Sequence, residues 1–449
     1  MKTLLLAASS LVATAAFALG PRIDPATVSL TQDRARLVTV KYTLENCPGI
    51  VTLDFQTNRL NAATTDEADW VSIGGENVQG VEGDVNRLVT ELGEHTLTWQ
   101  PRELWPDHKT KTGAFRAVVT VWATNAPPDY LVVDLVEDKT VRYYTSADFL
   151  PYGGLTNDIY RTDSIVLRKI AAKGRVWNMG LDTTQYGSSA NNRQHKVILT
   201  NDYYMGVFLL TRGQFRKFAT ANSKAEQNYC YAIKGSNVNC WQYGSVEGYA
   251  DDVATAKLDV VPVVVSYEKM RGVAGEGYDW IVNRHKVQDN RWLGHARTKT
   301  GVDFDLPTEA QWEFAARGGC TENTYNGEMV ASTAGTILTP IAHWGGSTMW
   351  YRVGTKLPND YGLYDVLGNG YECVLDWYAE DYGGTDVVFA PEGPATGTAH
   401  VFRSMYTTWD YSRHHLGHRL PSSTSAPVGT YVGTRIMCPL ALTYPESEK

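Results

Sequence analysis

The sequence predicts an α+β protein built from an all-β sandwich and a larger part in which short helices and strands are mixed. Two domains are expected because the 449 residues exceed the size at which a single hydrophobic core stops growing. Residues 36–122 alternate between apolar and polar side chains, whereas helix and strand signals are interleaved from about residue 164. A composition of 43% hydrophobic and 20% charged residues is typical of a globular protein.

The alternating region contains four stretches in which every second residue is apolar, the pattern of strands that bury one face. No helical period interrupts them, and Gly, Asn and Asp residues separate them, which is typical of a small antiparallel sandwich of the immunoglobulin type. A linker is expected next because Pro127 and Pro128 cannot continue a ladder. The apolar faces comprise Val38, Val40, Tyr42 and Leu44, then Val51, Leu53 and Phe55, then Leu97 and Trp99, then Phe115, Ala117, Val119 and Val121.

The second part begins its helices at recognisable caps. Thr211 and Thr308 are each followed three residues later by Gln and then by apolar residues, which predicts two capping boxes. The second helix is expected to end at Gly318, and the β-branched run at 260–267 predicts a buried strand. The chain is therefore divided into a signal peptide at 1–18, a sandwich at 19–124, a linker and connecting segment at 125–163 and a mixed domain at 164–449.

The first residues have the pattern of a secretory signal peptide. Lys2 precedes an apolar run from Leu4, and Ala16-Phe17-Ala18 fits an A-x-A cleavage site. No later apolar run approaches the roughly 20 residues that a membrane-spanning helix needs. A secreted or periplasmic protein of bacterial origin, with no membrane span, is therefore expected.

The charge balance argues against a nucleic-acid partner. Lys and Arg total 41 against 49 Asp and Glu, so the net charge of −8 leaves no basic surplus for a phosphate backbone. The six cysteines are too few for a disulfide scaffold. Cys230 and Cys240 form either a disulfide or two buried thiols.

Five segments occur in an order that identifies a family: WNMG from Trp177, DYYMGVFLLTRGQFRKF from Asp202, PVVVSY from Pro262, LPTEAQWEFAARGG from Leu306 and NDYGLYDVLGNGYECVLDWY from Asn359. From about residue 164 to the C-terminus the sequence resembles the formylglycine-generating enzyme family, also called the sulfatase-modifying factor domain. The resemblance implies a variant of the C-type lectin fold with long loops. It does not by itself imply catalysis, because one fold hosts many functions.

The family's enzymes oxidise a sulfatase cysteine to formylglycine with copper held by two cysteines near the C-terminus. Aligning Arg403 and Arg419 with the family's arginines places Trp409 and His414 at the two cysteine positions. Neither residue supplies the thiolate that Cu(I) prefers, so no catalytic residue and no copper are expected. The resemblance also places Cys373 in a core strand and Cys438 after the terminal strand, where the two could form a disulfide if those strands are neighbours.

The same C-terminal stretch is dense in aromatic and basic residues, a composition typical of binding hot spots. His414, His415 and His418 could alternatively hold copper or zinc, although histidines in a polar loop more often face solvent or a ligand. The predicted ligand-binding residues are Tyr406, Trp409, Tyr411, Arg413, His414, His415, His418 and Arg419.

A structural calcium ion is expected upstream. Residues 357–402 contain eight acids and no Lys or Arg, a field that attracts a cation. Asp365 and Glu372 flank Gly368 and Gly370, and this spacing offers carboxylates and turn carbonyls, the hard ligands that Ca²⁺ prefers. The resemblance assigns calcium to these four positions. The alternative is a turn whose carboxylates only cap backbone N–H groups.

Three functions remain open. The favoured one is a secreted, non-catalytic family member that binds an unidentified protein or glycan ligand. The second is the family's oxidase activity, or a related metal-dependent oxidation. The third is an extracellular adaptor that docks through the N-terminal sandwich.

Overall fold

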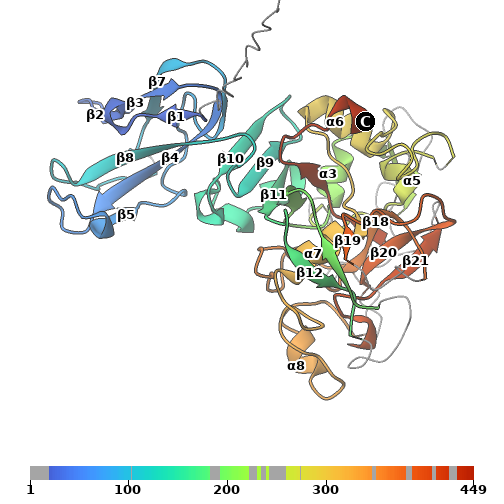
Figure 1. Ribbon diagram of the computed structural model, residues 1–449. Helices are drawn as coiled ribbons and strands as arrows, with labels where there is room; N and C mark the ends of the chain where they lie inside the picture. Colours follow the sequence, from blue (N-terminus) through green and yellow to red (C-terminus); the bar gives the residue numbers. More distant parts are fainter. Residues whose placement is uncertain are drawn as a thin grey trace, which may run out of the picture. The chain divides into compact units, whose positions relative to one another are not determined.

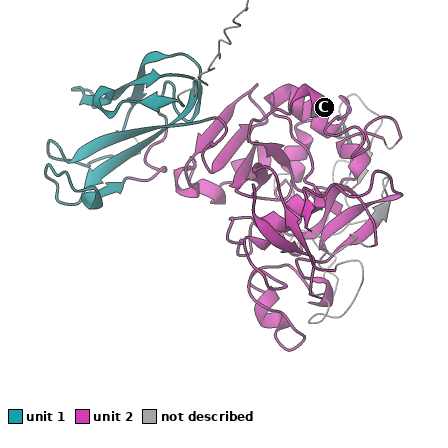
Figure 2. Cartoon of the chain, in the orientation of Figure 1, with its two compact units in different colours: residues 1–72, 80–123 teal, residues 73–79, 124–449 magenta. Residues whose placement is uncertain are grey.

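The computed structural model describes residues 20–448 except 103, 183–192, 222–229, 234–238, 242–258, 274, 346–349, 381–386, 407–410 and 424–431. Its elements can be followed along the chain in Figure 1. The chain divides into two compact units, which Figure 2 colours separately. The first runs to Ser72 and resumes over Gly80–Ala123, and the second comprises Ile73–Gln79 and everything from Thr124.

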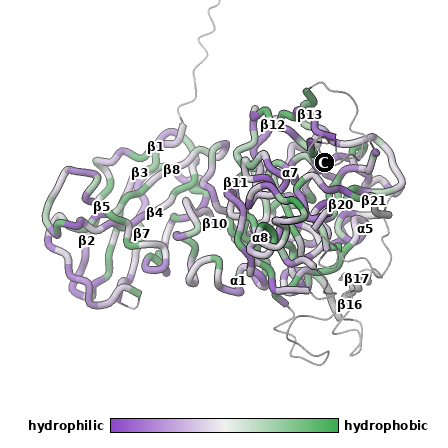
Figure 3. The backbone as a smooth tube through the Cα atoms, turned by 90° about the horizontal axis from the view of Figure 1, so that it is seen from below, coloured by the Kyte–Doolittle hydropathy of each residue, from purple (hydrophilic) through white to green (hydrophobic). Residues whose placement is uncertain are grey.

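The first unit consists of two antiparallel sheets. β3 pairs with β1, β2 and β7, and β4 pairs with β5, β6 and β8. Apolar and polar residues alternate along these strands (Figure 3), so the four predicted strands are confirmed. The rings of Phe55 and Trp99, one from each sheet, stack with centroids 4.6 Å apart, which joins the two inner faces in one core. The strands are β1 (Arg22–Ile23), β2 (Ser29–Gln32), β3 (Val38–Glu45), β4 (Gly49–Asn58), β5 (Trp70–Ser72), β6 (Arg87–Val89), β7 (Gly93–Trp99) and β8 (Phe115–Trp122).

The segment 125–163, predicted as a linker, is folded into the second unit, so that prediction is wrong. β9 (Tyr130–Asp134) and β10 (Val141–Tyr144) pair with each other, and β9 pairs with β11 (Ser164–Ile170). Pro127 and Pro128 do end one ladder, but an apolar run follows at once and begins a new buried strand. The two proline carbonyls accept hydrogen bonds from the side chains of Lys169 and Tyr204, which hold the proline pair beside β11 and β14.

The second unit is mixed, with strands predominating. Its largest sheet has the order β10-β9-β11-β14-β23, and a four-stranded sheet has the order β21-β20-β18-β22. Smaller sheets join β12 to β13 and β19, and β15 to β16 and β17. The added strands are β12 (Val176–Met179), β13 (His195–Ile198), β14 (Tyr203–Gly206), β15 (Ala219–Ala221), β16 (Cys230–Ile233), β17 (Asn239–Trp241), β18 (Gly370–Trp377), β19 (Val388–Phe389), β20 (Ala399–Met405), β21 (Leu420–Ser423), β22 (Val432–Thr434) and β23 (Met437–Pro439).

The helices of this unit are short. Both predicted capping boxes are present, since Thr211 and Gln214, and likewise Thr308 and Gln311, exchange side-chain and backbone hydrogen bonds. The helix from Thr308 ends at Gly318 in the left-handed conformation, as predicted. The helices are α1 (Ile159–Thr162), α3 (Arg212–Arg216), α5 (Tyr267–Met270), α6 (Trp292–Thr300), α7 (Glu309–Arg317) and α8 (Ala334–Leu338). No helix in the described part of the chain is both long and apolar enough to span a bilayer.

The predicted strand at 260–267 is wrong. Only an isolated bridge joins Pro262 to Thr211, and α5 begins at Tyr267. Pro262 has no N–H to donate, and the amides of Val263 and Val265 bond to Leu210 and Val432, which belong to different neighbours. The run is buried and extended, but no single strand lies beside it.

Candidate functional site

A buried cluster of ion pairs connects α7 to the C-terminal part of the chain. Arg403 on β20 donates to Glu309 Oε1 at 2.9 Å and to Glu313 Oε2 at 2.5 Å. Arg419 donates to both carboxylate oxygens of Glu309 at 2.7 Å. These four side chains are almost fully buried. The segment from 411 to 419 is therefore fixed at its end by the same helix that anchors β20.

The cluster extends to a third arginine. Arg317 donates to Glu313 Oε1 at 2.8 Å and to the carbonyl oxygen of Gly180 at 2.6 Å. Burial opposes ionisation of Glu313, but the guanidinium groups of Arg403 and Arg317 hold its pKa below the usual range. The glutamate therefore stays charged inside the core, where Arg403, Arg317 and the backbone N–H of Gly180 donate to it.

Asp376 on β18 lies at the edge of this cluster in the opposite state. Its Oδ2 accepts a hydrogen bond from the backbone N–H of Glu309 at 2.7 Å, at the first residue of α7. Burial and then the neighbouring Glu309 carboxylate raise the pKa of Asp376 well above its usual value. The carboxyl groups of Glu309 and Asp376 thus lie close together. Glu309 is ion-paired with Arg403 and Arg419, whereas Asp376 is the more easily protonated of the two.

The predicted ligand surface is only partly at the surface. Tyr406 and His414 are 0% exposed and Arg419 is 3% exposed, so these three are corrected to interior positions. Arg419 is buried because it forms an ion pair with Glu309, a buried carboxylate that needs a cationic partner. Trp409 lies outside the described residues. The half-buried members of the predicted set are Tyr411, Arg413, His415 and His418.

The two half-buried histidines lie beside each other. The rings of His415 and His418 are 5.3 Å apart and almost perpendicular. Burial, followed by the positive charge of Arg403, lowers the pKa of His415 to about 3, and burial likewise lowers the pKa of His418. Both imidazoles are therefore neutral near pH 7. Within the described residues, no three His, Cys, Asp or Glu side chains converge as metal ligands, so the three-histidine metal site is not formed.

Three cysteines of the second unit, Cys320, Cys373 and Cys438, are buried or half-buried thiols, whereas the side chains of the predicted pair Cys230 and Cys240 lie outside the described residues. Cys373 and Cys438 are both free, which makes the predicted disulfide wrong: β18 and β23 belong to different sheets. Burial raises the pKa of Cys373 to about 12 and that of Cys438 further. Burial and a hydrogen bond to Glu322 raise the pKa of Cys320 to about 11. These thiols are therefore protonated and unreactive at neutral pH.

The predicted calcium ligands lie in the turn before β18, which holds Asp365 and Gly368, and at the start of β18, which holds Gly370 and Glu372. Asp365 is buried and accepts a hydrogen bond from the backbone N–H of Gly354 at 2.7 Å. Glu372 is already neutralised, since Arg435 donates to its two oxygens at 3.1 and 3.0 Å and Trp312 donates to Oε2 at 2.7 Å. Gly368 and Gly370 have positive φ values, as the tight turn requires. The residues fit calcium only in part, because Glu372 would share its oxygens with a guanidinium, and calcium binding stays a prediction.

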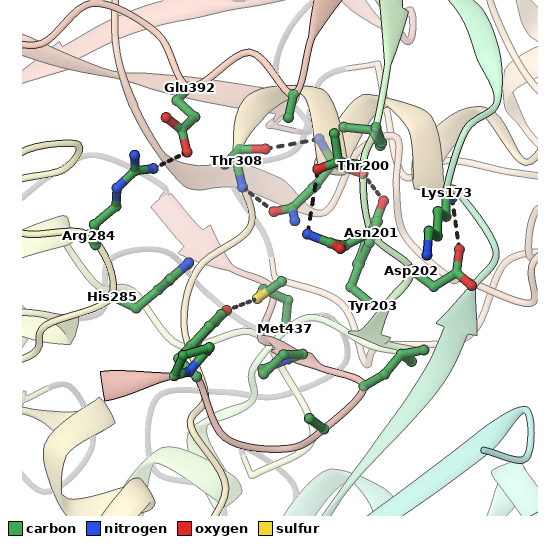
Figure 4. A pocket seen from close by; sticks show the side chains of 18 of the residues that line it. Lys173, Thr200, Asn201, Asp202, Tyr203, Arg284, His285, Thr308, Glu392 and Met437 are labelled. Atoms are coloured by element: carbon green, nitrogen blue, oxygen red, sulfur yellow. Dashed lines mark hydrogen bonds and ion pairs between the residues drawn. The ribbon is translucent and has the colours of Figure 1, made fainter. Parts of the chain in front are cut away.

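A cavity of about 720 Å³ opens elsewhere in the second unit (Figure 4). Its walls come from the loop before β14, the N-terminus of α7, the segment from Trp280 to His285 and the chain after β23. Arg284 is ion-paired with Glu392, and Lys173 lies near Asp202, whose carboxylate accepts from the Lys173 backbone N–H. The charged groups of the wall are thus balanced.

His285 is held in one orientation at this cavity. Its Nδ1 lies 2.8 Å from Asp305 Oδ2, and its ring stacks on Tyr444 with centroids 3.6 Å apart. Burial opposes ionisation of Asp305, but Arg271, which bonds both carboxylate oxygens, holds its pKa at about 2. A permanent carboxylate accepts a hydrogen bond from Nδ1–H, which holds the ring in one orientation, and no described residue bonds to Nε2. Figure 4 shows the ring pointing toward the middle of the cavity.

Comparison with known proteins shows which family the chain resembles. The profile described as the sulfatase-modifying factor enzyme 1-like domain matches residues 174–419, more than half of the chain. The chain belongs to this family. The matched region includes both capped helices, the ion cluster of α7 and the turn before β18.

Curated relatives of this sulfatase-modifying factor domain share only part of their length with the chain. The formylglycine-generating enzyme of Thermomonospora curvata is 34% identical over 136 residues, which are 26% of this chain and 43% of that protein. The serine/threonine-protein kinase pkn1 of Chlamydia pneumoniae is 33% identical over 153 residues, 33% of this chain and 23% of that protein. Among solved structures, Treponema denticola variable protein 1 has a TM-score of 0.42 and 22% identity, covering 62% of this chain and 95% of that chain.

Sequence reasoning missed both the carboxylates of the ion cluster and the cavity. Glu309 and Glu313 stand inside the family motif, one turn apart on α7, and two acids on the buried side of an apolar helix were the available signal. Nothing in the sequence singled out His285 and Asp305, because they are 20 residues apart and their partner Tyr444 is far along the chain.

Replacing Arg403 with methionine is expected to destabilise the fold by about 3–5 kcal/mol, because Glu309 and Glu313 would each lose a buried partner. Chemical denaturation would measure the change. Arg403→Met combined with Glu313→Gln should recover part of the loss, whereas the exposed control Arg175→Met should stay within about 0.5 kcal/mol of the parent. An equal effect of Arg403→Met and Arg175→Met would contradict the role of the cluster.

Asp376→Asn is expected to stabilise the protein at pH 7 by on the order of 1 kcal/mol. The raised pKa means that the folded state holds the proton more tightly than the unfolded state, so stability falls as pH rises above about 4, the unfolded value. An asparagine cannot ionise, so the variant does not lose this stability as the pH rises. Denaturation between pH 3 and 8 should show the gap growing with pH, with Asp360→Asn, an exposed control, showing none. A gap independent of pH would refute the shifted titration.

Proposed function

We propose that this chain is an exported, non-catalytic member of the sulfatase-modifying factor family that binds a protein or glycan ligand. The observation that carries the proposal is the contrast within one segment. Arg403 and Arg419, the aligned frame, form their buried ion pairs, while the aligned position between them holds the buried imidazole of His414. The arginines that support the scaffold are therefore present, although the residue aligned with a thiolate of the family's copper site is a histidine.

The described thiols support the same conclusion. Cys320, Cys373 and Cys438 all have raised pKa values, and the two buried ones lie in core strands. A copper site of the family's type needs two thiolates on one ion, and these residues do not fit it. A curated relative named inactive C-alpha-formylglycine-generating enzyme 2, from Bos taurus, is 31% identical over 149 residues, 46% of its length. That name is consistent with loss of catalysis within the family.

Two places in the second unit suit a ligand. Tyr411, Arg413, His415 and His418 combine aromatic, cationic and neutral imidazole groups at half-buried positions. The cavity beside His285 offers an imidazole whose orientation is set by Asp305. Rigid, partly desolvated polar groups of this kind bind at low entropic cost.

The finer architecture is part of the proposal. We assign the second unit to the C-type-lectin-like variant that the family resemblance implies, and the first unit to an immunoglobulin-like sandwich. Two antiparallel sheets that share one core through Phe55 and Trp99 support the latter. The signal-like residues 1–18 support export to the periplasm or the cell exterior.

The protein is expected not to generate formylglycine. It would be incubated with Cu(I), oxygen and a sulfatase-type cysteine peptide, and the cysteine followed by mass spectrometry. Turnover should not exceed that of copper alone, because an imidazole and an indole replace the two thiolates. The paired variant Trp409→Cys, His414→Cys should gain copper uptake, with each single variant as control. Turnover by the parent protein would overturn the proposal.

Calcium is expected to raise the melting temperature through Asp365. A ligand that binds only the folded state stabilises it by RT ln(1 + [L]/Kd), which is about 2.7 kcal/mol at roughly 100 Kd. Thermal melts with calcium and with a chelator would measure the difference. Asp365→Asn should weaken the calcium-dependent part, and Asp360→Asn, exposed in the same segment, should keep it. A melting temperature indifferent to chelation would mean that the turn is held by its protein hydrogen bonds alone.

A further inference from the structure

The first unit contains a cavity of its own, of about 750 Å³, which no step of the proposed function uses. It lies where the loop between β7 and β8 approaches the ends of β2 and β3. Every residue that lines it belongs to the first unit. This volume is typical of small-molecule and oligosaccharide sites.

Aromatic rings line part of the cavity. Trp105 stacks on His108 with centroids 4.2 Å apart and an interplanar angle of 8°, and it packs on Phe115 at 5.7 Å. Trp99, at 6.3 Å from Trp105, joins this stack to the core of the unit. The stack holds the loop that carries Trp105 against β8 and β7, and so the cavity has a fixed apolar wall.

Four cations also line the cavity. Arg36, Arg102, Lys109 and Lys111 all line the cavity, all are exposed, and none forms an ion pair with a described residue. Asp107 is the acid among the lining residues. Among the described lining residues, cations therefore outnumber acids by four to one.

Cations of the first unit gather at the cavity. Outside it, Arg22, Lys41, Arg87 and Arg116 are each ion-paired with an acid, whereas Arg34 and Arg59 are exposed single cations that do not line this cavity. The whole chain has a net charge of −8, so four unpaired cations around one opening run against the overall balance. Unpaired cations beside a hollow attract an anionic ligand and focus its approach.

We infer that this cavity binds an acidic carbohydrate, whose carboxylate or sulfate groups bond to the cations while its sugar rings pack on the aromatic wall. Arg36 and Arg102 offer planar forks that match either anion. Trp105 and Phe115 offer ring surface to the apolar faces of pyranose rings. This function would be additional to the ligand binding proposed for the second unit, and it does not depend on it.

An acidic peptide is the less fitting occupant. Peptides added to a sheet use unpaired backbone groups, and the loop at this cavity bonds its own amides: Trp105 N to Pro101 O and Ala114 N to Lys111 O. The Lys111 amide bonds to the side chain of Asn61. These three amides are therefore not free to pair with an added peptide strand.

The test uses the full chain and defined probes: oligogalacturonate for carboxylate, a heparin-derived hexasaccharide for sulfate, and maltohexaose as the neutral sugar. Titration calorimetry should show binding of one or both acidic probes and none of the neutral one. Raising the salt concentration should weaken that binding, because exposed charge pairs are screened. Carboxylate and sulfate sources are distinguished by which acidic probe binds more tightly.

Matched variants locate the site. Lys111→Glu should reduce affinity at least about ten-fold, whereas Arg59→Glu, an equal charge change at an exposed residue of the same unit outside the cavity, should change it less than about two-fold. Trp105→Ala should also abolish binding, and a thermal melt would report whether the fold is kept. His108→Ala removes one ring of the stack and tests the same wall if Trp105→Ala unfolds the unit.

Three results would overturn the inference. The first is no binding of either acidic probe at low salt. The second is an equal loss in Lys111→Glu and Arg59→Glu, which would indicate diffuse attraction. The third is binding of hexaglutamate as tight as that of the acidic sugars, which would show that charge alone is recognised and would favour an acidic peptide.

Discussion

The structure of the second unit depends on the charges buried between α7 and the C-terminal strands. Glu309 and Glu313 would be strongly destabilising inside the core without Arg403, Arg317 and Arg419. The three arginines come from separate parts of the chain, so the pairs are satisfied only when α7, β20 and the segment ending at 419 meet. A buried ion cluster of this kind contributes little net stability, but it strongly disfavours any other arrangement of these segments. The fold of a loop-rich unit can therefore be specific without long helices.

The same cluster separates scaffold from chemistry. Arg403 and Arg419 point inward, and Arg403 also donates to the carbonyl oxygen of Leu416. Side chains in the intervening stretch, such as Tyr411 and His415, can change without altering the buried pairs. A family that keeps the frame and varies the stretch would retain its fold while losing or replacing its activity.

Local features of the fold were predictable, whereas contacts between distant residues were not. The strand at 38–44 and the helix from Thr308 follow from side-chain period and capping, which act over a few residues. The linker prediction failed because a proline pair signals the end of one ladder and says nothing of the strand that follows at Tyr130. The inward position of Arg419 depends on Glu309, 110 residues earlier, and no pattern in the neighbourhood of either residue reports that pairing. The composition of the C-terminal stretch predicted that Arg419 lies on the surface, whereas its ion pair with Glu309 places it in the interior.

Buried arginine recurs as the means by which this unit holds its irregular segments. Arg271 pairs with Asp305 and also donates to the carbonyl oxygen of Arg284 at 2.6 Å; Arg435 pairs with Glu372 and donates to Gly206 and Tyr364. A guanidinium has five donors, so after satisfying a carboxylate it still bonds backbone carbonyls, among them the loop carbonyls of Arg284 and Tyr364. Each such arginine replaces several missing ladder bonds in a protein with short strands. The orientation of His285 follows from one of them, since the carboxylate that positions its ring is itself positioned by Arg271. The features that build the scaffold and those that present a ligand site thus share the same buried charges.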